Sequence, residues 1–526
     1  MERVDLLPPP ADDDAARRDG LARRADAYAA VPLLNCLLRE VGEPVADTDG
    51  RRTYRLPGSG RLLRVRGTRR PTAPEVRTAG GWQPLGHPEL VKLAAEELRR
   101  HTGVPNHELP TEMTDSRDVV AALLAARARS DPPHDPYLRS EQALVTGHTH
   151  HPAPKSRGGG PAAAWLPYAP EAHARFPLAL LALREDTVVD EGDTSALDRL
   201  GSAPPGYRLL PAHPWQLDLA AARLAPAFAD GRLLRLGTTG SDTWPTAAVR
   251  TVYAPGRDLF LKFSLDVRIT NDIRRLWRHD LDRRAHTDAA ARSALAAFDG
   301  PAAWLSDRGH RTADFADEEL AVVVRDGLRR HLLPGATPYL AAALAEGFDG
   351  NPLAAAADPD AWWEAYLARV VPPALAAYAR HGVVLEAHLQ NTLVAMGTDG
   401  RPAQALFRDA EGVKLLAGAG PTGRAAGAPP GVSQEAGWER LVYCLVVNHL
   451  LEIAAALADH HPGLDPWPAV RRELARAGLP EATALLTAPT LPGKTNLLLR
   501  WTGADGADAR YRPLPNPLAA GPSTGR

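Results

Sequence analysis

Cysteine is almost absent from this chain of 526 residues, which has only Cys36 and Cys444. Two thiols exclude a disulfide scaffold and any zinc or iron–sulfur site that needs four cysteine ligands. This usage is typical of a reducing compartment, and we expect a cytoplasmic protein. The N-terminus has no basic segment followed by an apolar stretch, so no secretory signal is predicted.

The chain also lacks a charge excess, since 61 basic and 63 acidic residues leave a formal net charge of -2. This balance excludes a strongly basic nucleic-acid binder and a highly acidic solvating chain. The most apolar run, 441–457, contains Asn448, His449 and Glu452, so it predicts a core helix and not a membrane span. We expect no nucleic-acid partner and no membrane association.

Lysine is the third scarcity, because only five of the 61 basic residues are lysines. Arginine cannot replace lysine where a compact point charge on a slim stem is needed. The remaining lysines are therefore candidates for functional positions. They are Lys92, Lys155, Lys262, Lys414 and Lys494.

The segment pattern predicts an α+β, multidomain protein with a β-rich middle and a largely helical C-terminal region. We expect a mostly helical region over 1–137, a β-rich region over 138–335 and a mostly helical region with a short hairpin over 336–526. Apolar periodicity predicts helices at 21–41, 89–101, 119–129, 285–298, 317–332, 361–380, 439–459, 466–477 and 481–486. Short apolar runs predict strands at 207–210, 232–237, 247–253, 259–263, 382–385, 392–396 and 403–407, and a hairpin at 51–66. We expect a surface loop over 417–437 and terminal tails.

A first candidate site is the loop 147–159, in which glycines and prolines exclude a regular helix. It carries His148, His151, Lys155 and Arg157. Imidazoles and two cations on a shaped loop favour binding of a carboxylate or a phosphate. A solvated histidine-rich turn is the alternative. A zinc site is disfavoured because the histidines are closely spaced and no HExxH or cysteine partner appears.

A second candidate site lies between residues 250 and 280, where seven basic residues outnumber four acidic ones. Adjacent antiparallel strands would place Arg250 beside Lys262, and Arg274 or Arg275 would open a helix beyond them. Three converging cations are unfavourable unless an anion is bound. Lys262, inside an apolar strand, indicates a phosphate contact; a solvated charged face is the alternative.

A third candidate site combines Glu386, His388, Gln390 and Asn391 with Asp409. Carboxylate oxygens are the ligands that Mg²⁺ takes together with phosphates. A strand pair joined by the turn 397–400 would bring Asp409 back beside Asn391. These residues could also be ordinary polar loop positions.

No Walker A sequence and no G-x-G-x-x-G after a strand occurs, so side chains must hold the phosphates. The strand lysine, the His388 loop and Asp409 together predict an ATP–Mg²⁺ site. His213-Pro214-Trp215-Gln216 is a weaker signal, and a structural role is commoner for such a segment than a catalytic one.

These motifs resemble, in order, those of the siderophore synthetases that are independent of nonribosomal peptide synthetases (NIS synthetases), the aerobactin-synthetase-like family. The matching pieces span about 138–412, and weaker similarity continues through Asn448-His449-Leu450 and Lys494. They are Gly147-His148-x-x-His151-Pro152-x-x-Lys155-x-Arg157-x-Gly159, His213-Pro214-Trp215-Gln216, Pro245-Thr246-x-x-x-Arg250-Thr251, Lys262-x-Ser264-Leu265, Ile269-Thr270-Asn271-x-x-Arg274, Glu386-x-His388-x-Gln390-Asn391 and Arg408-Asp409-x-x-Gly412.

The resemblance implies a cupped-hand architecture of thumb, fingers and palm with ATP between fingers and palm. It implies that a carboxylate of citrate or a similar polycarboxylic acid attacks the α-phosphate of ATP. An amine, hydroxylamine or alcohol then attacks the acyl-adenylate and releases AMP. It further implies a homodimer.

By the same resemblance, the nucleotide contacts are Arg250, Thr251, Lys262, Asn271, Arg274, His388, Gln390 and Asn391. Glu386 and Asp409 would ligate Mg²⁺, and Lys155 and Arg157 would bind the substrate carboxylate. His148 and His151 would complete the catalytic set. Ala247-Ala248 departs from relatives that often carry serine before the Arg-Thr pair, so we expect that one hydroxyl contact to phosphate or to the acyl group is missing.

A kinase-like small-molecule phosphotransferase is the alternative enzyme, since Lys262, the His388 loop and Asp409 would serve it too. The loop 147–159 favours the ligase, because a kinase has little use for a second dense anion site. A siderophore-handling or iron-reducing protein is the non-enzyme alternative, and the two cysteines disfavour a cysteine-ligated cluster.

Overall fold

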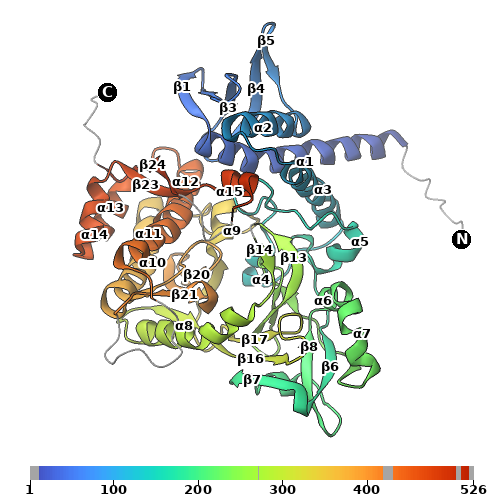
Figure 1. Cartoon of the computed structure of the whole chain (residues 1–526). Helices are drawn as coiled ribbons and strands as arrows, with labels where there is room; N and C mark the ends of the chain where they lie inside the picture. Colours follow the sequence, from blue (N-terminus) through green and yellow to red (C-terminus); the bar gives the residue numbers. More distant parts are fainter. Residues whose placement is uncertain (1–10, 271, 419–430, 505–510, 520–526) are drawn as a thin grey trace, which may run out of the picture.

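The N-terminal region of the chain packs helices beside a small sheet at one end of the molecule (Figure 1). The structure is a computed structural model that describes residues 11–270, 272–418, 431–504 and 511–519. Helices α1 (Ala11–Glu40), α2 (His87–Thr102) and α3 (Glu108–Arg127) accompany a five-stranded antiparallel sheet, whereas α4 (Pro136–Glu141) packs in another core, with Phe260 and Leu340. The strands are β1 (Glu43–Thr48), β2 (Arg51–Arg55), β3 (Leu62–Arg66), β4 (Thr72–Thr78) and β5 (Gly81–Pro84). A helix from the far end of the chain, α15 (Asn496–Thr502), returns to this core through Leu497 and Trp501.

The middle region is built on a six-stranded sheet in the order β10-β11-β12-β17-β16-β7. Its strands are β7 (Val188–Gly192), β10 (Trp244–Pro245), β11 (Thr251–Ala254), β12 (Leu259–Phe263), β16 (Asp307–Ala313) and β17 (Val322–Asp326). A three-stranded sheet of β6 (Ala179–Arg184), β8 (Tyr207–Ala212) and β9 (Leu233–Thr238) lies beside it, with the short helices α5 (Ala162–Trp165), α6 (Pro214–Leu219) and α7 (Ala221–Ala229). The hairpin β13 (Leu265–Ile269) and β14 (Asp272–Arg274) follows β12.

The last region surrounds a four-stranded sheet in the order β15-β21-β20-β18 with helices (Figure 1). Its strands are β15 (Ala302–Leu305), β18 (Thr337–Leu340), β20 (Thr392–Met396) and β21 (Pro402–Arg408), with the small pairs β19 (Val383–Val384)–β22 (Lys414–Leu415) and β23 (Thr490–Lys494)–β24 (Tyr511–Pro515). Its helices are α8 (Arg278–Ala296), α9 (Ala341–Glu346), α10 (Pro359–His381), α11 (Gln434–Leu441), α12 (Leu451–His460), α13 (Trp467–Arg476) and α14 (Pro480–Thr487). The main apolar core lies here and includes Trp362, Trp363 and Tyr366 of α10.

The apolar run predicted as a core helix has that role. Among the described residues, one helix, Gln434–His460, is long and apolar enough to cross a membrane, and 78% of its most apolar window is buried inside the protein. Its middle, Val442–Leu450, is π-helical. Asn448 and His449 lie within this segment, and the His449 side chain hydrogen-bonds to the Tyr366 hydroxyl and the Ala387 carbonyl.

Several predicted elements are wrong in type or pairing. Residues 317–332 contain strand β17 in place of the predicted helix, because Val322, Val323 and Val324 are buried in the middle of a sheet, where branched side chains pack well. Strand β19 pairs with β22 and not with β20. Helix α3 starts 11 residues before the predicted position, and β24 lies in the predicted C-terminal tail. Most of the predicted loop 417–437 lies outside the described residues. The mixed α+β class and the β-rich middle are confirmed, whereas the domain boundaries stay a prediction.

Candidate active site

The buried cations of the candidate site lie on one face of the six-stranded sheet. In the antiparallel register, Thr251 of β11 pairs with Lys262 of β12, and Phe260 of β12 pairs with Arg325 of β17. Because side chains alternate along a strand, Lys262 and Arg325 leave the sheet on the same side. Leu259, Leu261 and Phe263 point to the other side, into the core shared with the three-stranded sheet. The alternation therefore places Lys262, which is 4% exposed, among polar groups.

Two carboxylates meet this cationic face from the turn after β21. Lys262 Nζ lies 2.6 Å from Asp409 Oδ1 and 2.7 Å from Glu411 Oε2. Arg250 Nη2 lies 3.1 Å from Glu411 Oε2, and Arg325 Nη2 lies 3.1 Å from Asp409 Oδ1. We call these five side chains the charge cluster. It confirms that Arg250 and Lys262 lie side by side and adds Glu411 and Arg325, which sequence reasoning missed.

The cations of the charge cluster keep both carboxylates ionised. Burial by itself would raise the pKa of Glu411, but Lys262 and Arg250 outweigh it and lower the pKa to about 2. Burial is likewise outweighed at Asp409, where Lys262 and Arg325 hold the pKa well below its usual range. Since three cations surround two anions, a further anionic group can be accommodated.

Arg250 and Arg274 connect the charge cluster to the β13–β14 hairpin. Arg250 Nη1 donates to the carbonyls of Arg274 and Arg275 at 3.0 and 2.9 Å. Arg274 Nη2 donates to the Ile269 carbonyl at 2.7 Å and to the Thr270 hydroxyl at 2.5 Å. Burial and the neighbouring Arg250 lower the pKa of Arg274. The expectation that Arg274 or Arg275 opens a helix is wrong, because β14 ends at Arg274 and α8 begins at Arg278; Asn271 lies outside the described residues.

The loop that follows β19 places the second predicted metal ligand. Glu386 pairs with Arg440 of α11 and accepts a hydrogen bond from Asn391 Nδ2 at 3.3 Å. A Cβ atom on Gly412 would overlap the Glu386 carboxylate, so a side chain at this position would displace Glu386. The Arg408 N–H donates to the Asn391 carbonyl at 3.1 Å, which confirms that the β20–β21 hairpin returns beside Asn391.

His388 lies between the two predicted metal ligands. Burial lowers its pKa, while Glu386 and Asp409 both act in the opposite direction. Its Nδ1 accepts the Gln390 N–H at 3.2 Å. An imidazole that stays neutral near pH 7 can form hydrogen bonds to phosphate without adding a fourth positive charge.

The histidine loop 147–159 reaches the same site through His148. Loss of hydration, together with the nearby His150, His388 and Lys494, lowers the pKa of His148 to about 3. Two loops separated by 240 residues in the chain are thus electrostatic neighbours. His150 Nε2 lies 3.0 Å from Glu452 Oε1, whereas His151 is buried and its Nδ1 accepts the Ala153 N–H at 3.2 Å.

Lys155 and Arg157 have a carboxylate partner within the chain. Lys155 Nζ forms an ion pair with Glu171, and Arg157 Nη2 lies 3.1 Å from the same Glu171 oxygen. All three side chains are buried. Burial would raise the pKa of Glu171, but Lys155 and Arg157 lower it to about 2. The substrate-carboxylate role of Lys155 and Arg157 stays a prediction.

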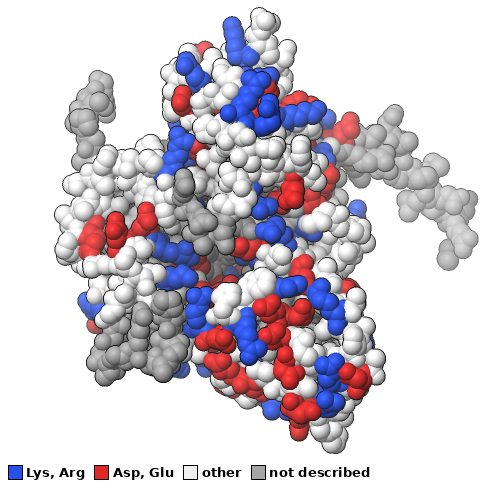
Figure 2. Space-filling model, viewed as in Figure 1, with Lys and Arg blue, Asp and Glu red and all other residues white. Residues whose placement is uncertain are grey.

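Three further cations surround Glu386. Arg440 forms an ion pair with it. Burial and Arg440 lower the pKa values of Lys414 and Lys494, and Glu386 only partly opposes this effect. Figure 2 shows lysine and arginine side chains gathered beside the hollow between the middle and C-terminal regions. Sequence reasoning singled out Lys494 but assigned no role to Lys414 or Arg440.

The segment His213-Pro214-Trp215-Gln216 has a structural role. His213 Nδ1 accepts the Trp215 N–H at 3.2 Å at the start of α6, and the rings of Tyr168, Phe176 and Phe263 surround its imidazole. Gln216 accepts the Asp266 N–H at 2.8 Å and so ties α6 to β13. The segment therefore supports the hairpin that carries Arg274.

Hard oxygen donors are available for Mg²⁺ in Glu386, Asp409 and Glu411. No group of three or more His, Cys, Asp or Glu side chains within the described part of the chain could hold a metal by itself. This donor set fits Mg²⁺, which characteristically combines one or two carboxylates with substrate phosphates.

The structure thus shows a multidomain α+β protein in which buried cations and carboxylates from distant segments gather in one cluster. The family profile described as IucA / IucC family matches residues 136–346, and that of the ferric iron reductase FhuF-like transporter matches residues 360–509. Residues 136–346 thus match the IucA / IucC family of siderophore synthetases, as their motifs predicted.

Named relatives and solved structures extend over most of the chain. It is 28% identical to the L-2,3-diaminopropanoate–citrate ligase of Staphylococcus aureus, over 82% of this chain and 83% of the relative. It is 28% identical to the rhizobactin siderophore biosynthesis protein RhbC of Rhizobium meliloti, over 94% and 98%. The ATP-bound aerobactin synthetase IucA of Klebsiella pneumoniae superposes with a TM-score of 0.79 at 23% identity, over 94% of this chain and all of that one.

Proposed function

We propose that the protein is an ATP-dependent siderophore synthetase. It activates a carboxylate of citrate or a related polycarboxylic acid and joins it to an amine, hydroxylamine or alcohol, with release of pyrophosphate and AMP. This is the function predicted from the sequence, and the citrate ligases among its relatives support the ligase class. The observation that carries the proposal is the charge cluster, in which Arg250, Lys262 and Arg325 surround two carboxylates on a buried sheet face.

The first half-reaction brings two anions together. One carboxylate oxygen of the acid attacks the α-phosphorus, the bond to the β-phosphate oxygen breaks, and pyrophosphate leaves. Two polyanions repel each other in water, so positioning and charge neutralisation account for much of the catalysis. Lys262, Arg250 and Arg274 bind phosphate oxygens, Thr251, Gln390 and Asn391 add hydrogen bonds, and His388 contributes a neutral imidazole. Asn271 is proposed here from its motif alone.

Mg²⁺ bound with ATP supplies additional neutralisation of the phosphates. Glu386 and Asp409 are the proposed ligands. Arg440 pairs with Glu386, and Lys262 and Arg325 pair with Asp409. These ion pairs fix the positions of both carboxylates before the nucleotide binds. ATP therefore lies between the sheet of the middle region and the turn after β21.

The acid substrate needs cations that the nucleotide does not use. Lys494, near His148 and Glu386, is our choice. Lys155 and Arg157 are already neutralised by buried Glu171, so we assign to them the positioning of the loop that carries His148 and His151. This departs from the role that the sequence suggested for them.

The second half-reaction breaks the acyl–phosphate bond. The nucleophile's nitrogen or oxygen attacks the acyl carbon, AMP leaves with the bonding electron pair, and the nucleophile gives up a proton. His148 Nδ1 accepts the His150 N–H at 3.1 Å, so the neutral ring carries its proton on Nε2 and can donate a hydrogen bond to an oxygen of the departing AMP.

Whether ATP is converted to AMP and pyrophosphate or to ADP distinguishes this proposal from a kinase-like phosphotransferase. Incubation with ATP, Mg²⁺, citrate and hydroxylamine should give AMP, pyrophosphate and a hydroxamate. ADP as the product would overturn the ligase assignment. A panel that crosses several acids with diamines, amino acids and amino alcohols then identifies the substrate pair.

We further propose a homodimer in the cytoplasm. Light scattering on the purified protein tests the dimer, and fractionation of the producing cell tests the compartment. A monomer at micromolar concentration would contradict the first part.

A further inference from the structure

Asp307 lies behind the charge cluster and contacts Arg325, one of its members. Arg325 Nε donates to Asp307 Oδ1 at 2.5 Å, and Arg325 Nη2 lies 3.2 Å from Asp307 Oδ2. The same Nη2 donates to Asp409 Oδ1 at 3.1 Å. The Asp307 side chain is fully buried and that of Arg325 is 3% exposed. Neither residue belongs to the motifs from which the site was predicted.

Asp409 has a backbone conformation that needs support. Its φ of 83° is in the left-handed region, where a residue with a Cβ is strained. Such strain persists only where surrounding contacts fix it, and it is concentrated at functional sites. Some part of the fold must therefore hold Asp409 in place.

Asp307 supplies that support from two directions. Through Arg325 it holds the Asp409 side chain, and Asp307 Oδ2 also accepts the N–H of the next residue, Ala410, at 3.3 Å. The Thr287 hydroxyl donates to the Ala410 carbonyl at 2.8 Å. Both backbone polar groups of Ala410 are thus held, one by Asp307 and the other by Thr287.

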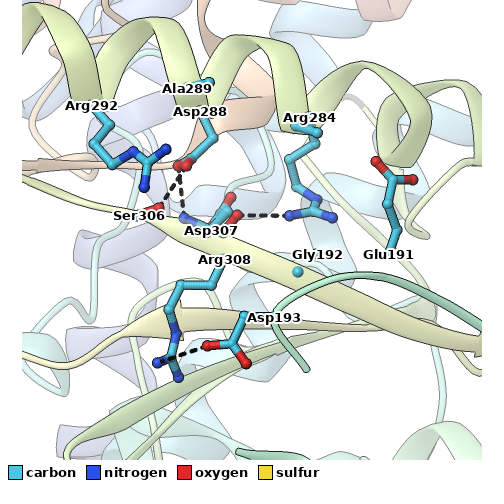
Figure 3. A pocket seen from close by; sticks show the side chains of 12 residues that line it. Glu191, Gly192, Asp193, Arg284, Asp288, Ala289, Arg292, Ser306, Asp307 and Arg308 are labelled. Atoms are coloured by element: carbon cyan, nitrogen blue, oxygen red, sulfur yellow. Dashed lines mark hydrogen bonds and ion pairs between the residues drawn. The ribbon is translucent and has the colours of Figure 1, made fainter. Parts of the chain in front are cut away.

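Asp307 is itself fixed by helix α8. Its N–H donates to Asp288 Oδ1 at 2.8 Å, and its carbonyl accepts from Arg284 Nη1 at 2.9 Å. Figure 3 shows these contacts beside a cavity of about 220 Å³ that Arg284, Asp288 and Asp307 line. Asp288 also accepts from Ser306 and Trp304, so its oxygens are fully used within the fold.

We infer that Asp307 and Arg325 are positioning residues, which hold Asp409 so that Lys262 and the Asp409 carboxylate are correctly placed for ATP. The inference rests on the proposed function for the identity of the ligand. A positioning role differs from a purely structural one, in which the buried pair would contribute to stability alone. A buried ion pair is often replaceable by neutral side chains without loss of stability, so the two roles can be separated.

The decisive variant replaces both members of the pair, as Asp307→Asn with Arg325→Met. Each single substitution leaves one buried charge without its partner and should lower the unfolding temperature. The double substitution removes that imbalance and should restore much of the stability. If the pair positions Asp409, the double variant still binds ATP about tenfold more weakly and loses on the order of tenfold or more in kcat for pyrophosphate exchange.

Calorimetric titration with ATP, with and without Mg²⁺, measures the ATP affinity of each variant and so tests the inference without any acid substrate. A wild-type protein that binds ATP but catalyses no exchange would count against the proposed function and leave the positioning test readable. A double variant with restored stability and wild-type ATP affinity would overturn the inference.

Two further variants keep the test decisive. Arg325→Lys retains a cation but cannot reach Asp307 and Asp409 with separate nitrogens. It should therefore fold and bind ATP more weakly. Wild-type affinity would overturn the inference even if the double variant did not fold.

Arg311→Met is the matched control, because Arg311 is an equally buried arginine on β16 that pairs with Asp190 and Asp198. It should lose stability but retain ATP affinity in the folded protein.

Discussion

Lys262 and Asp409 are 147 residues apart in the chain, and their side chains meet at 2.6 Å. One residue comes from the middle of strand β12 and the other from the turn after β21. Glu411 shares the same ammonium group at 2.7 Å. The chain's own carboxylates thus neutralise the lysine that we propose for phosphate binding.

Substitution of Lys262 or Arg274 by alanine should abolish adenylation while the fold survives. Loss of a preorganised cation at the transferring phosphoryl group typically costs about 100-fold or more in rate. Exchange of labelled pyrophosphate into ATP measures this step. Lys92→Ala, on the exposed side of α2, is the lysine control and should leave exchange unchanged. Normal exchange in Lys262→Ala would show that the site is misplaced. His388→Ala should behave like the two cation variants.

Glu411→Gln should change ATP binding in the opposite direction. Removing this carboxylate frees Arg250 and Lys262 from an internal competitor, so the KM for ATP should fall. The free protein should become less stable by about 1–3 kcal/mol, because buried cations lose a partner. Glu411→Asp, which keeps the charge, serves as the comparison in both thermal unfolding and kinetics. A higher KM for ATP in Glu411→Gln would indicate that Glu411 contacts the nucleotide or its metal directly.

Stability should fall in acid through Glu171. Lys155 and Arg157 lower its folded pKa to about 2 from a reference value of 4.5. A depressed folded pKa contributes stability above the unfolded pKa, and this contribution is lost as the pH falls from about 4.5 toward 2. The maximal contribution is about 3 kcal/mol. Urea unfolding of the wild type and of Glu171→Gln between pH 7 and pH 3 measures it: the difference between them should shrink as the pH decreases. A constant difference would contradict the prediction.

Lys494→Gln should weaken binding of the acid substrate and leave the nucleotide site intact. The expected result is a KM for citrate raised about tenfold with little change in the KM for ATP, since one charge-assisted contact is lost. Initial rates at varied citrate and fixed saturating ATP provide the measurement. Arg472→Gln, an exposed arginine of α13 that pairs with Glu364, is the surface control. Equal effects on both KM values would instead place Lys494 at the nucleotide.

Local pattern determined much of the fold before any tertiary contact was known. Strand β12 was predicted at its observed bounds because a short apolar run between polar turns fits a buried strand. Helix α10 was predicted within two residues at its start and one at its end, although Pro372 and Pro373 lie inside it. Strand β17 was missed because its three consecutive valines and flanking charges show no period that separates a buried strand from a helix.

The sequence by itself determined the residue types of the site and the order of its motifs. Lys262 in an apolar strand, the His388 loop and Asp409 were all identifiable, because each is unusual for its local surroundings. Only the tertiary structure decided which charges neutralise each other. It paired Lys155 and Arg157 with Glu171, Glu386 with Arg440, and Asp409 with Arg325. Such pairing depends on distances of a few ångströms between residues that lie 14 to 84 positions apart in the chain. Coulomb energy in a buried environment is set by those distances, and the local sequence does not contain them.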